Sequence, residues 1–197
     1  RSSRNPIASY EHRGGFRLGA PVGFRDFLWE ALLDPAPGVD MIATAERLAR
    51  EYGISREQVD AYALGSHQRA LLARDSGWLA EEIVAVGNER FELDGYQARG
   101  IELPRRVAEV TQDTHPRPAD AEALARLNAI HPGGVQTAGN SCAVVDGAAA
   151  ALVGRASDCT RSPLALLRAS SVLGVAPEIM GIGPAPAIQL QIGRAHV

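Results

Sequence analysis

The clearest helical pattern along the chain lies between residues 55 and 75. Ser55-Arg56-Glu57-Gln58 has the form of a capping box, in which the serine side chain accepts from the third amide and the glutamine reaches back. Apolar side chains then follow at helical spacing, at Val59, Tyr62, Ala63, Ala70 and Ala73. The sequence therefore predicts an amphipathic helix that Gly77 ends.

Shorter helices are predicted on both sides of it. One lies at about residues 24–33, within the loop-rich first 40 residues. Another spans residues 45–52, with Thr44 as its N-cap and Gly53 as its stop signal. A third spans residues 118–128, with a proline in its first turn, and a fourth lies near residues 155–160.

Short apolar runs predict strands at residues 82–86 and 107–110. Residues 147–153 are small and apolar on both faces, which is typical of a buried strand. A short helix and a further strand at residues 164–172 are predicted to follow. This β-α-β order indicates an α/β protein. It does not indicate a dinucleotide-binding fold, because no G-x-G-x-x-G sequence opens a helix.

The composition of the 197 residues, 46% hydrophobic and 22% charged, is that of an ordinary soluble globular protein. All 20 basic residues are arginine and the net charge is -3, so we expect no nucleic-acid partner. No apolar run approaches the roughly 20 residues that span a membrane, so we expect no membrane partner. With two cysteines and no zinc spacing, we expect no metal and a reducing, cytoplasmic setting. The first residues lack a methionine and a signal peptide, which indicates a slice of a larger protein.

Five ordered blocks resemble the thiolase family, the enzymes that make or cleave 3-ketoacyl-CoA thioesters. Residues 41–46 (MIATAE) are similar to M-G-x-T-A-E, and residues 54–64 (ISREQVDAYAL) to I-S-R-x-x-Q-D-x-F-A, with the glutamine shifted. Residues 81–84 (EEIV) resemble D-E-I-V, and residues 137–150 (TAGNSCAVVDGAAA) resemble T-A-G-N-x-S-G-x-N-D-G-A-A-A. Residues 180–187 (MGIGPAPA) match M-G-x-G-P-x-P-A. Five blocks in order are far more specific than any one of them.

This resemblance implies a layered αβαβα fold, of which the chain holds mainly the helical loop domain and part of the core sheet. Residues 1–136 would form the loop domain, which binds coenzyme A. Residues 137–163 would end the N-terminal core half, and residues 164–190 would start the C-terminal half. Residues 191–197 are interpreted as a non-native tail, because residues 192–197 look like translated sequencing-adapter read-through.

The family reaction, as the resemblance implies it, runs through a covalent acyl-cysteine. A low-pKa cysteine takes the acyl group from a thioester, and a second cysteine moves the proton for thiolysis or for Claisen condensation. A histidine and an asparagine-held water stabilise the thioester oxyanion. The nucleophile segment lies upstream of the matched part, and N-E-A-F, G-H-P-x-G and C-x-G-G-G-x-G lie downstream; none is present. We therefore expect a parent acyltransferase, while this chain holds no catalytic residue and is inactive alone.

The resemblance also implies the partners: CoA and acyl-CoA as substrates, no tightly bound cofactor, and a homodimer or homotetramer for the full-length protein. It assigns contacts with coenzyme A to Arg117, Ala138, Cys142 and Val144, and the acyl pocket to Met41. Arg117 corresponds to an arginine at the adenine end of CoA, where a guanidinium can stack and pair with phosphate. A solvated arginine, and core packing for Met41, are the alternatives.

Cys142 stands where the family has a serine that lines the pantetheine arm. A binding role or simple packing is therefore expected of it, and not catalysis. Asp40 and Ile42 replace a histidine and a glycine of the biosynthetic branch, which argues against short acetoacetyl specificity. Asn140 and Asp146 are expected to bond their own backbone in a tight turn. The remaining histidines and the second cysteine are interpreted as packing or surface residues: His12, His67, His115, His131 and Cys159.

Two other functions stay open at this point. One is a thiolase-like protein that binds acyl-CoA or lipid and has lost its catalytic cysteines. The other is an independent helical interaction module, which would require the blocks between residues 137 and 187 to be coincidental. The acyl chain length and the physiological direction of the reaction do not follow from the residues.

Overall fold

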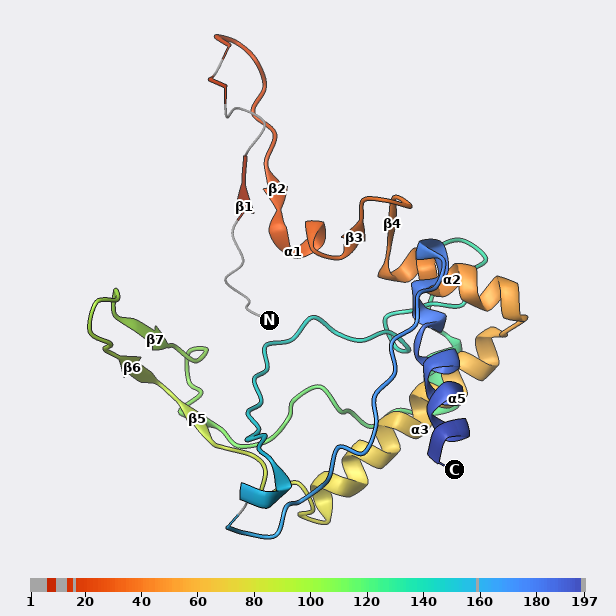
Figure 1. Ribbon diagram of the computed structural model, residues 1–197. Helices are drawn as coiled ribbons and strands as arrows, with labels where there is room; N and C mark the ends of the chain where they lie inside the picture. Colours follow the sequence, from red (N-terminus) through yellow and green to blue (C-terminus); the bar gives the residue numbers. More distant parts are fainter. Residues whose placement is uncertain (1–6, 10–13, 16, 159, 196–197) are drawn as a thin grey trace. The chain divides into compact units, whose positions relative to one another are not determined.

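A computed structural model describes residues 7–9, 14–15, 17–158 and 160–195 (Figure 1). Its contacts divide the chain into two compact units. The first unit comprises Arg1–Ser55, His131–Gln136 and Val144–Val197, and the second comprises Arg56–Ile130 and Thr137–Ala143. Each unit therefore combines segments that are distant in the sequence.

Two short antiparallel strand pairs begin the first unit. Strand β1 (Ile7–Ala8) pairs with β2 (Arg25–Asp26), and β3 (Leu33–Asp34) pairs with β4 (Val39–Asp40). The one-turn helix α1 (Phe27–Glu30) follows β2, and the carboxylate of its N-cap, Asp26, accepts a hydrogen bond from the second helical N–H at 2.8 Å. The helix predicted at residues 24–33 is thus wrong in extent, because its two ends belong to strands.

Helix α2 (Met41–Tyr52) is bounded by two local signals. The carboxylate of Asp40 caps its start by accepting from the third helical N–H at 2.7 Å. Gly53 ends it at φ 63°, a left-handed conformation that a Cβ would strain, and so the predicted stop is confirmed. The predicted cap is wrong: Thr44 lies inside the helix, where its buried hydroxyl donates to the carbonyl oxygen of Glu178 at 2.9 Å.

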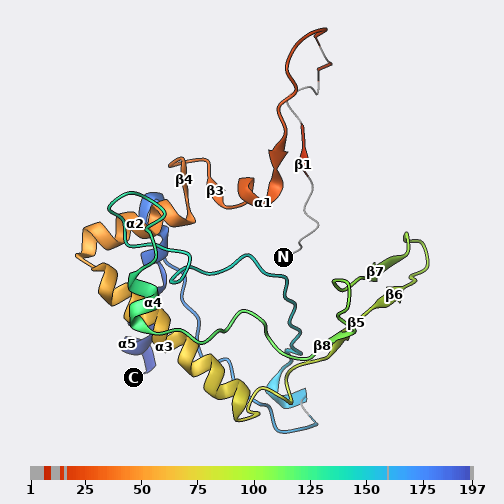
Figure 2. The same cartoon turned by 180° about the vertical axis from the view of Figure 1, so that it is seen from behind.

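The 3₁₀ helix η2 (Pro177–Ile182) packs against α2, and helix α5 (Pro184–Ala195) follows it (Figures 1 and 2). The approach is close at Gly181, where a Cβ would lie 2.8 Å from Cδ1 of Leu48. The hydroxyl of Ser171 donates to the carbonyl oxygen of Ala187 at 2.9 Å and so ties the preceding loop to α5.

Helices α3 (Arg56–Asp75) and α4 (Ala121–Ala125) pack together in the second unit. The long predicted helix is confirmed, although the side chain buried on it is Asp60, while Tyr62 is exposed. Helix α4 is shorter than the predicted residues 118–128, because Asp120 caps it, accepting from Ala123 N at 2.7 Å.

Four short strands complete the second unit. Strand β5 (Val86–Gly87) pairs antiparallel with β8 (Glu109–Val110), and β6 (Glu89–Phe91) with β7 (Arg99–Ile101). The strand predicted at residues 107–110 is confirmed in its second half. The one predicted at residues 82–86 is wrong over most of its length, because turn hydrogen bonds, such as Ile83 N to Leu79 O at 3.2 Å, fold that segment.

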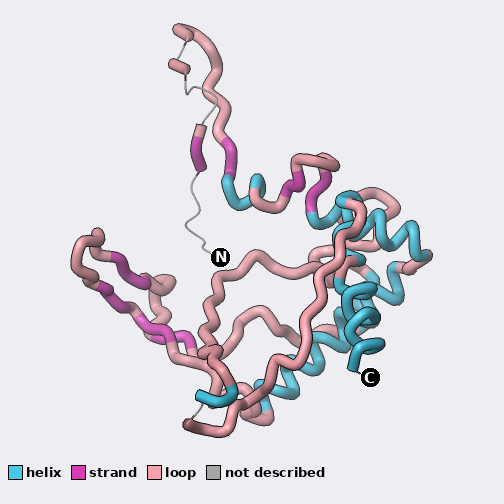
Figure 3. Tube along the Cα trace, in the orientation of Figure 1, coloured by secondary structure: helices cyan, strands magenta, loops and turns pink. Residues whose placement is uncertain are grey.

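The two predicted buried strands, residues 147–153 and 164–172, are loops in this structure (Figure 3). The short helix predicted between them is the 3₁₀ turn η1 (Ala156–Asp158). A strand needs a neighbour to accept and donate its backbone hydrogen bonds, and none of the described segments pairs with these two. Leu152 and Leu164, one in each segment, are fully exposed.

Candidate functional site

A tight turn, Thr137–Asn140, lies at the centre of the candidate site. The Thr137 side chain is fully buried, and its Oγ1 accepts from the backbone N–H groups of Gly139 and Asn140 at 3.2 and 3.3 Å. The Asn140 Oδ1 accepts from Thr137 N at 2.7 Å, so the prediction that this asparagine bonds its own turn is confirmed. Gly139 is required by packing, since a Cβ there would collide with the side chains of Leu127 and Leu124.

Residues in the first turns of α3 bind the turn Thr137–Asn140 through hydrogen bonds. Asp60, which is 6% exposed, accepts from Asn140 Nδ2 through Oδ1 at 2.8 Å and from Arg56 Nε through Oδ2 at 2.7 Å. A terminal nitrogen of Arg56 also donates to the carbonyl oxygens of Leu124 and Leu127, at 2.7 and 3.0 Å. Helix α3, the end of α4 and the turn are thus joined through two charged side chains.

Arg117 lies beside the same turn. A terminal nitrogen of its guanidinium donates to the carbonyl oxygen of Ala138 at 3.4 Å, so the structure brings together two of the residues predicted to contact coenzyme A. Both are exposed. The backbone N–H of Arg117 donates to Nδ1 of His67 at 3.5 Å, and the rings of His67 and His115 lie 5.7 Å apart. An arginine that is exposed next to an exposed backbone turn can meet an anion or an aromatic ring.

Cys142 follows the turn by two residues and is a free, exposed thiol. Its Sγ donates to the carbonyl oxygen of the next residue, Ala143, at 3.5 Å. A backbone carbonyl does not take up a proton in the way that a catalytic base does, so this contact gives the thiol no help in becoming a nucleophile.

The other two predicted site residues belong to the first unit. Met41 opens α2 and helps to line a cavity of about 250 Å³, together with the apolar side chains of Trp29, Leu32 and Leu33. Val144 is half exposed, in the loop that precedes the predicted strand at residues 147–153.

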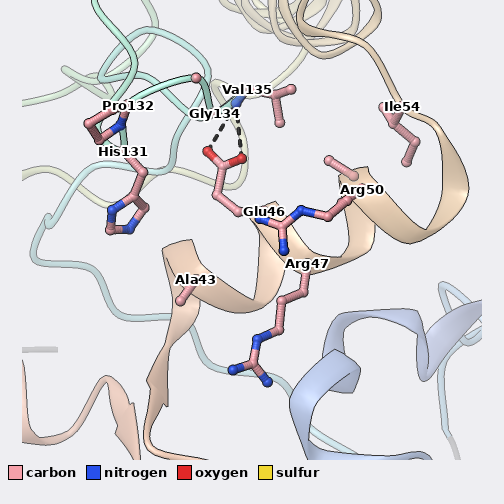
Figure 4. A pocket seen from close by; sticks show the side chains of 11 residues that line it. Ala43, Glu46, Arg47, Arg50, Ile54, His131, Pro132, Gly134 and Val135 are labelled. Carbon is pink, nitrogen blue, oxygen red and sulfur yellow. Dashed lines mark hydrogen bonds between the residues drawn. The ribbon is translucent and has the colours of Figure 1, made fainter.

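A second loop segment is anchored to α2 by Glu46 (Figure 4). The carboxylate accepts from Val135 N at 3.0 Å through each oxygen and from Gln136 N at 2.8 Å. Gly134 is needed beside it, because a Cβ at that position would collide with the carboxylate. Together with Arg50 and other residues, this contact borders a cavity of about 430 Å³.

The remaining candidates fall in different places. His131 lines the cavity beside Glu46, whereas His12 and Cys159 lie outside the described residues. Across the described ranges, no group of three or more His, Cys, Asp or Glu side chains could hold a metal ion. None of the helices among those residues is long and apolar enough to cross a membrane.

Sequence reasoning missed three supporting residues, Glu46, Arg56 and Asp60. Each of them carried a signal. Arg56 and Asp60 are spaced i and i+4 at the start of the best predicted helix, which suits an ion pair. Glu46 stands in one matched block, and the two glycines before Val135 indicate a close backbone approach.

Known proteins resemble this chain in both sequence and fold. The family described as "Thiolase, N-terminal domain" matches residues 2–157. The rat (Rattus norvegicus) protein named "3-ketoacyl-CoA thiolase B, peroxisomal" is 41% identical over 162 residues, which are 80% of this chain and 36% of that protein. The chain spans less than half the length of the curated relatives that it matches.

Solved structures agree with these matches. The crystal structure of Bacillus anthracis acetyl-CoA acetyltransferase is 35% identical, with a TM-score of 0.73 over 94% of this chain and 45% of that one. Human mitochondrial 3-ketoacyl-CoA thiolase in complex with CoA is 30% identical, with a TM-score of 0.56 over 68% of this chain and 30% of that one. The chain therefore has an α/β fold that it shares with these solved structures. The chain belongs to the thiolase family, as its ordered motifs predicted.

Proposed function

We propose that the protein that carries this chain transfers acyl groups between CoA thioesters, by thiolysis of a 3-ketoacyl-CoA or by Claisen condensation. Family membership and the names of two relatives, 3-ketoacyl-CoA thiolase and acetyl-CoA acetyltransferase, support this activity. The nucleophilic cysteine that forms the acyl-enzyme is proposed to lie outside the 197 residues.

The observation that carries the proposal is the meeting of Arg117 and Ala138 at one exposed turn. Our proposal is that this turn binds coenzyme A, with Arg117 at the nucleotide end and Cys142 and Val144 along the pantetheine arm. Human mitochondrial 3-ketoacyl-CoA thiolase, a relative with a solved structure, binds CoA in its complex, which supports this ligand. Residues 1–136 are proposed as the loop domain, residues 137–163 and 164–190 as parts of the two core halves, and residues 191–197 as a non-native tail.

In this proposal, the residues of the chain bind and orient the thioester. A guanidinium at the nucleotide end both pairs with phosphate and stacks on adenine, which anchors CoA far from the reacting carbonyl. Binding energy from that remote end holds the thioester in place for the chemical step. The cavity beside Met41 is proposed to take the acyl chain, because its thioether and the neighbouring apolar side chains suit a hydrocarbon.

Asp40 and Ile42, which flank Met41, separate this chain from the short-chain biosynthetic branch. Asp40 is committed to capping α2 through its carboxylate. We therefore propose that the full-length protein is not specific for acetoacetyl-CoA.

The test begins with the source DNA on both sides of the reading frame, followed by expression of the full-length protein. We expect loss of 3-ketoacyl-CoA when CoA is added, with thioesters of longer acyl chains accepted as well as acetoacetyl-CoA. The 197-residue chain alone is expected to show no turnover above a protein-free blank. A full-length protein that binds CoA without turnover, and that lacks the cysteines, would instead be a non-catalytic acyl-CoA-binding relative.

We further propose a cytoplasmic location and a homodimer or homotetramer for the full-length protein. A chain with only two cysteines fits a reducing compartment, although the name of the rat relative places that protein in peroxisomes. Cell fractionation tests the first proposal, and light scattering coupled to size-exclusion chromatography tests the second.

A further inference from the structure

The turn Thr137–Asn140 has an inner and an outer side. Thr137 and Gly139 are buried, whereas Ala138 between them is exposed and meets Arg117 through its carbonyl oxygen. The side chain of Asn140 points inward and ends on Asp60. The contact between Asn140 and Asp60 therefore holds the outer side of the turn, which is proposed above to face coenzyme A, in position.

Asp60 is the group on which this inner side depends. An ionised carboxylate only accepts hydrogen bonds, and here each oxygen receives one, from Asn140 Nδ2 at 2.8 Å and from Arg56 Nε at 2.7 Å. Arg56 is fixed in turn, because its terminal nitrogen meets two carbonyl oxygens at the end of α4. The carboxylate therefore joins helices α3 and α4, through Arg56, to the turn, through Asn140.

We propose that Asp60 is a positioning residue for coenzyme A binding, acting through Asn140 to hold the outer face of the turn. This inference rests on the proposed function, since the ligand is the one proposed there. Asp60 is not expected to touch CoA, because it is buried beneath the turn. Its removal should therefore loosen the turn and weaken CoA binding, while the chemical step with bound substrate proceeds as before.

The experiment compares Asp60→Asn with Glu122→Gln in the full-length protein. An amide offers one acceptor oxygen, so Asp60→Asn must lose one of the two contacts. Glu122 makes an exposed pair with Arg126 at 3.2 Å in the same unit, so Glu122→Gln is a matched loss of one carboxylate charge. For Asp60→Asn we expect KM and Kd for CoA to rise about tenfold, as when a buried hydrogen-bonded group is left unpaired. The kcat at saturating CoA should stay near that of the wild type, and the control should change neither constant.

A second variant guards against failure of Asp60→Asn to fold. Asn140→Ser removes the amide that reaches Asp60, together with the oxygen that accepts from Thr137 N, so it should raise KM for CoA at least as much. In the double variant the two effects should add to less than their sum, since both break the same contact. Lower thermal stability with an unchanged KM for CoA in both variants would overturn the inference. Wild-type protein without measurable CoA binding would overturn the proposed function instead.

Discussion

The guanidinium of Arg117 is the group on which proposed CoA recognition depends most directly, so its removal is the sharpest test. Within the described residues, it makes one contact, the 3.4 Å hydrogen bond to the carbonyl oxygen of Ala138. That distance is at the long end of the hydrogen-bond range, so losing this bond should affect folding little. A loss of affinity in Arg117→Ala would thus report on the ligand.

The magnitude follows from the number of contacts at stake. A hydrogen bond to a charged group contributes about 1.5–3 kcal/mol, and exposure to water favours the lower end. Because Arg117 is exposed, we expect a loss near 1.5 kcal/mol, which is about tenfold in Kd. Arg117→Lys keeps the charge but loses the planar donors, and should recover only part of the affinity.

Isothermal titration of the full-length protein with CoA measures these differences. Arg126→Ala is the matched control, because Arg126 is also an exposed arginine of the second unit and pairs with Glu122 at 3.2 Å. Equal affinity in Arg117→Ala and Arg126→Ala would refute the assignment of Arg117 to the nucleotide end. Full recovery of CoA affinity in Arg117→Lys would show that a positive charge alone is sufficient, and it would exclude stacking on adenine.

Three further substitutions test the surroundings of the site. Glu46→Gln should lower Tm, with a loss of about 1–3 kcal/mol of stability, because a neutral amide weakens the charge-assisted bonds from Val135 N and Gln136 N and places an NH₂ group where Oε2 faces Val135 N. An unchanged unfolding curve would contradict this role of Glu46. Gly139→Ala should lower the free energy of unfolding by about 1–3 kcal/mol, because the added methyl group overpacks the turn, and it should weaken CoA binding in titration. Unaltered stability and affinity would show that the turn has room for a Cβ. Cys142→Ser should keep kcat in the thiolysis assay, since no catalytic role is assigned to the thiol; a loss of several orders of magnitude would identify a nucleophile.

Local signals explain why helix α3 and the end of α2 were predicted well. The start of α3 at Arg56 and the stop of α2 at Gly53 depend on residues a few positions away, so one sequence holds the information. The cap of α2 was misplaced because the local sequence offers two candidates. Asp40 and Thr44 can both cap a helix, and the burial of Thr44 against the distant Glu178 decides between them.

The strands failed for a different reason. An apolar run such as residues 147–153 states only that the segment suits burial, whereas a strand also needs a neighbouring strand. None of the described segments supplies one, so the run stays a loop and its side chains stay exposed. The composition of the run predicted its preference for burial, but strand pairing determines whether it forms a strand.

In the candidate site, too, one part could be predicted from the sequence and another part depended on the fold. Arg117 and Ala138 could be predicted because the family motifs contain them, but their contact joins positions 21 residues apart and needed the fold. Asp60 was missed because a hydrophobic pattern assigns the buried face of a helix to apolar side chains, such as that of Tyr62. Its burial is compatible with its charge only because Arg56 and Asn140 satisfy both oxygens, and Asn140 is 80 residues away.

Hydrogen bonds and an ion pair, more than apolar packing, hold the turn Thr137–Asn140 in place. The buried apolar side chains among the described residues are Val39, Ala49 and Leu124, and Leu124 alone belongs to the second unit. Removing one partner of a buried ion pair costs about 3–5 kcal/mol, more than trimming a half-exposed apolar side chain. In the second unit, loss of Asp60 should therefore disturb the turn more than truncation of Val59, which is only half buried on the same helix. Hydrogen exchange at the amides of Gly139 and Asn140 would rank the two, and faster exchange in Val59→Ala than in Asp60→Asn would contradict this order.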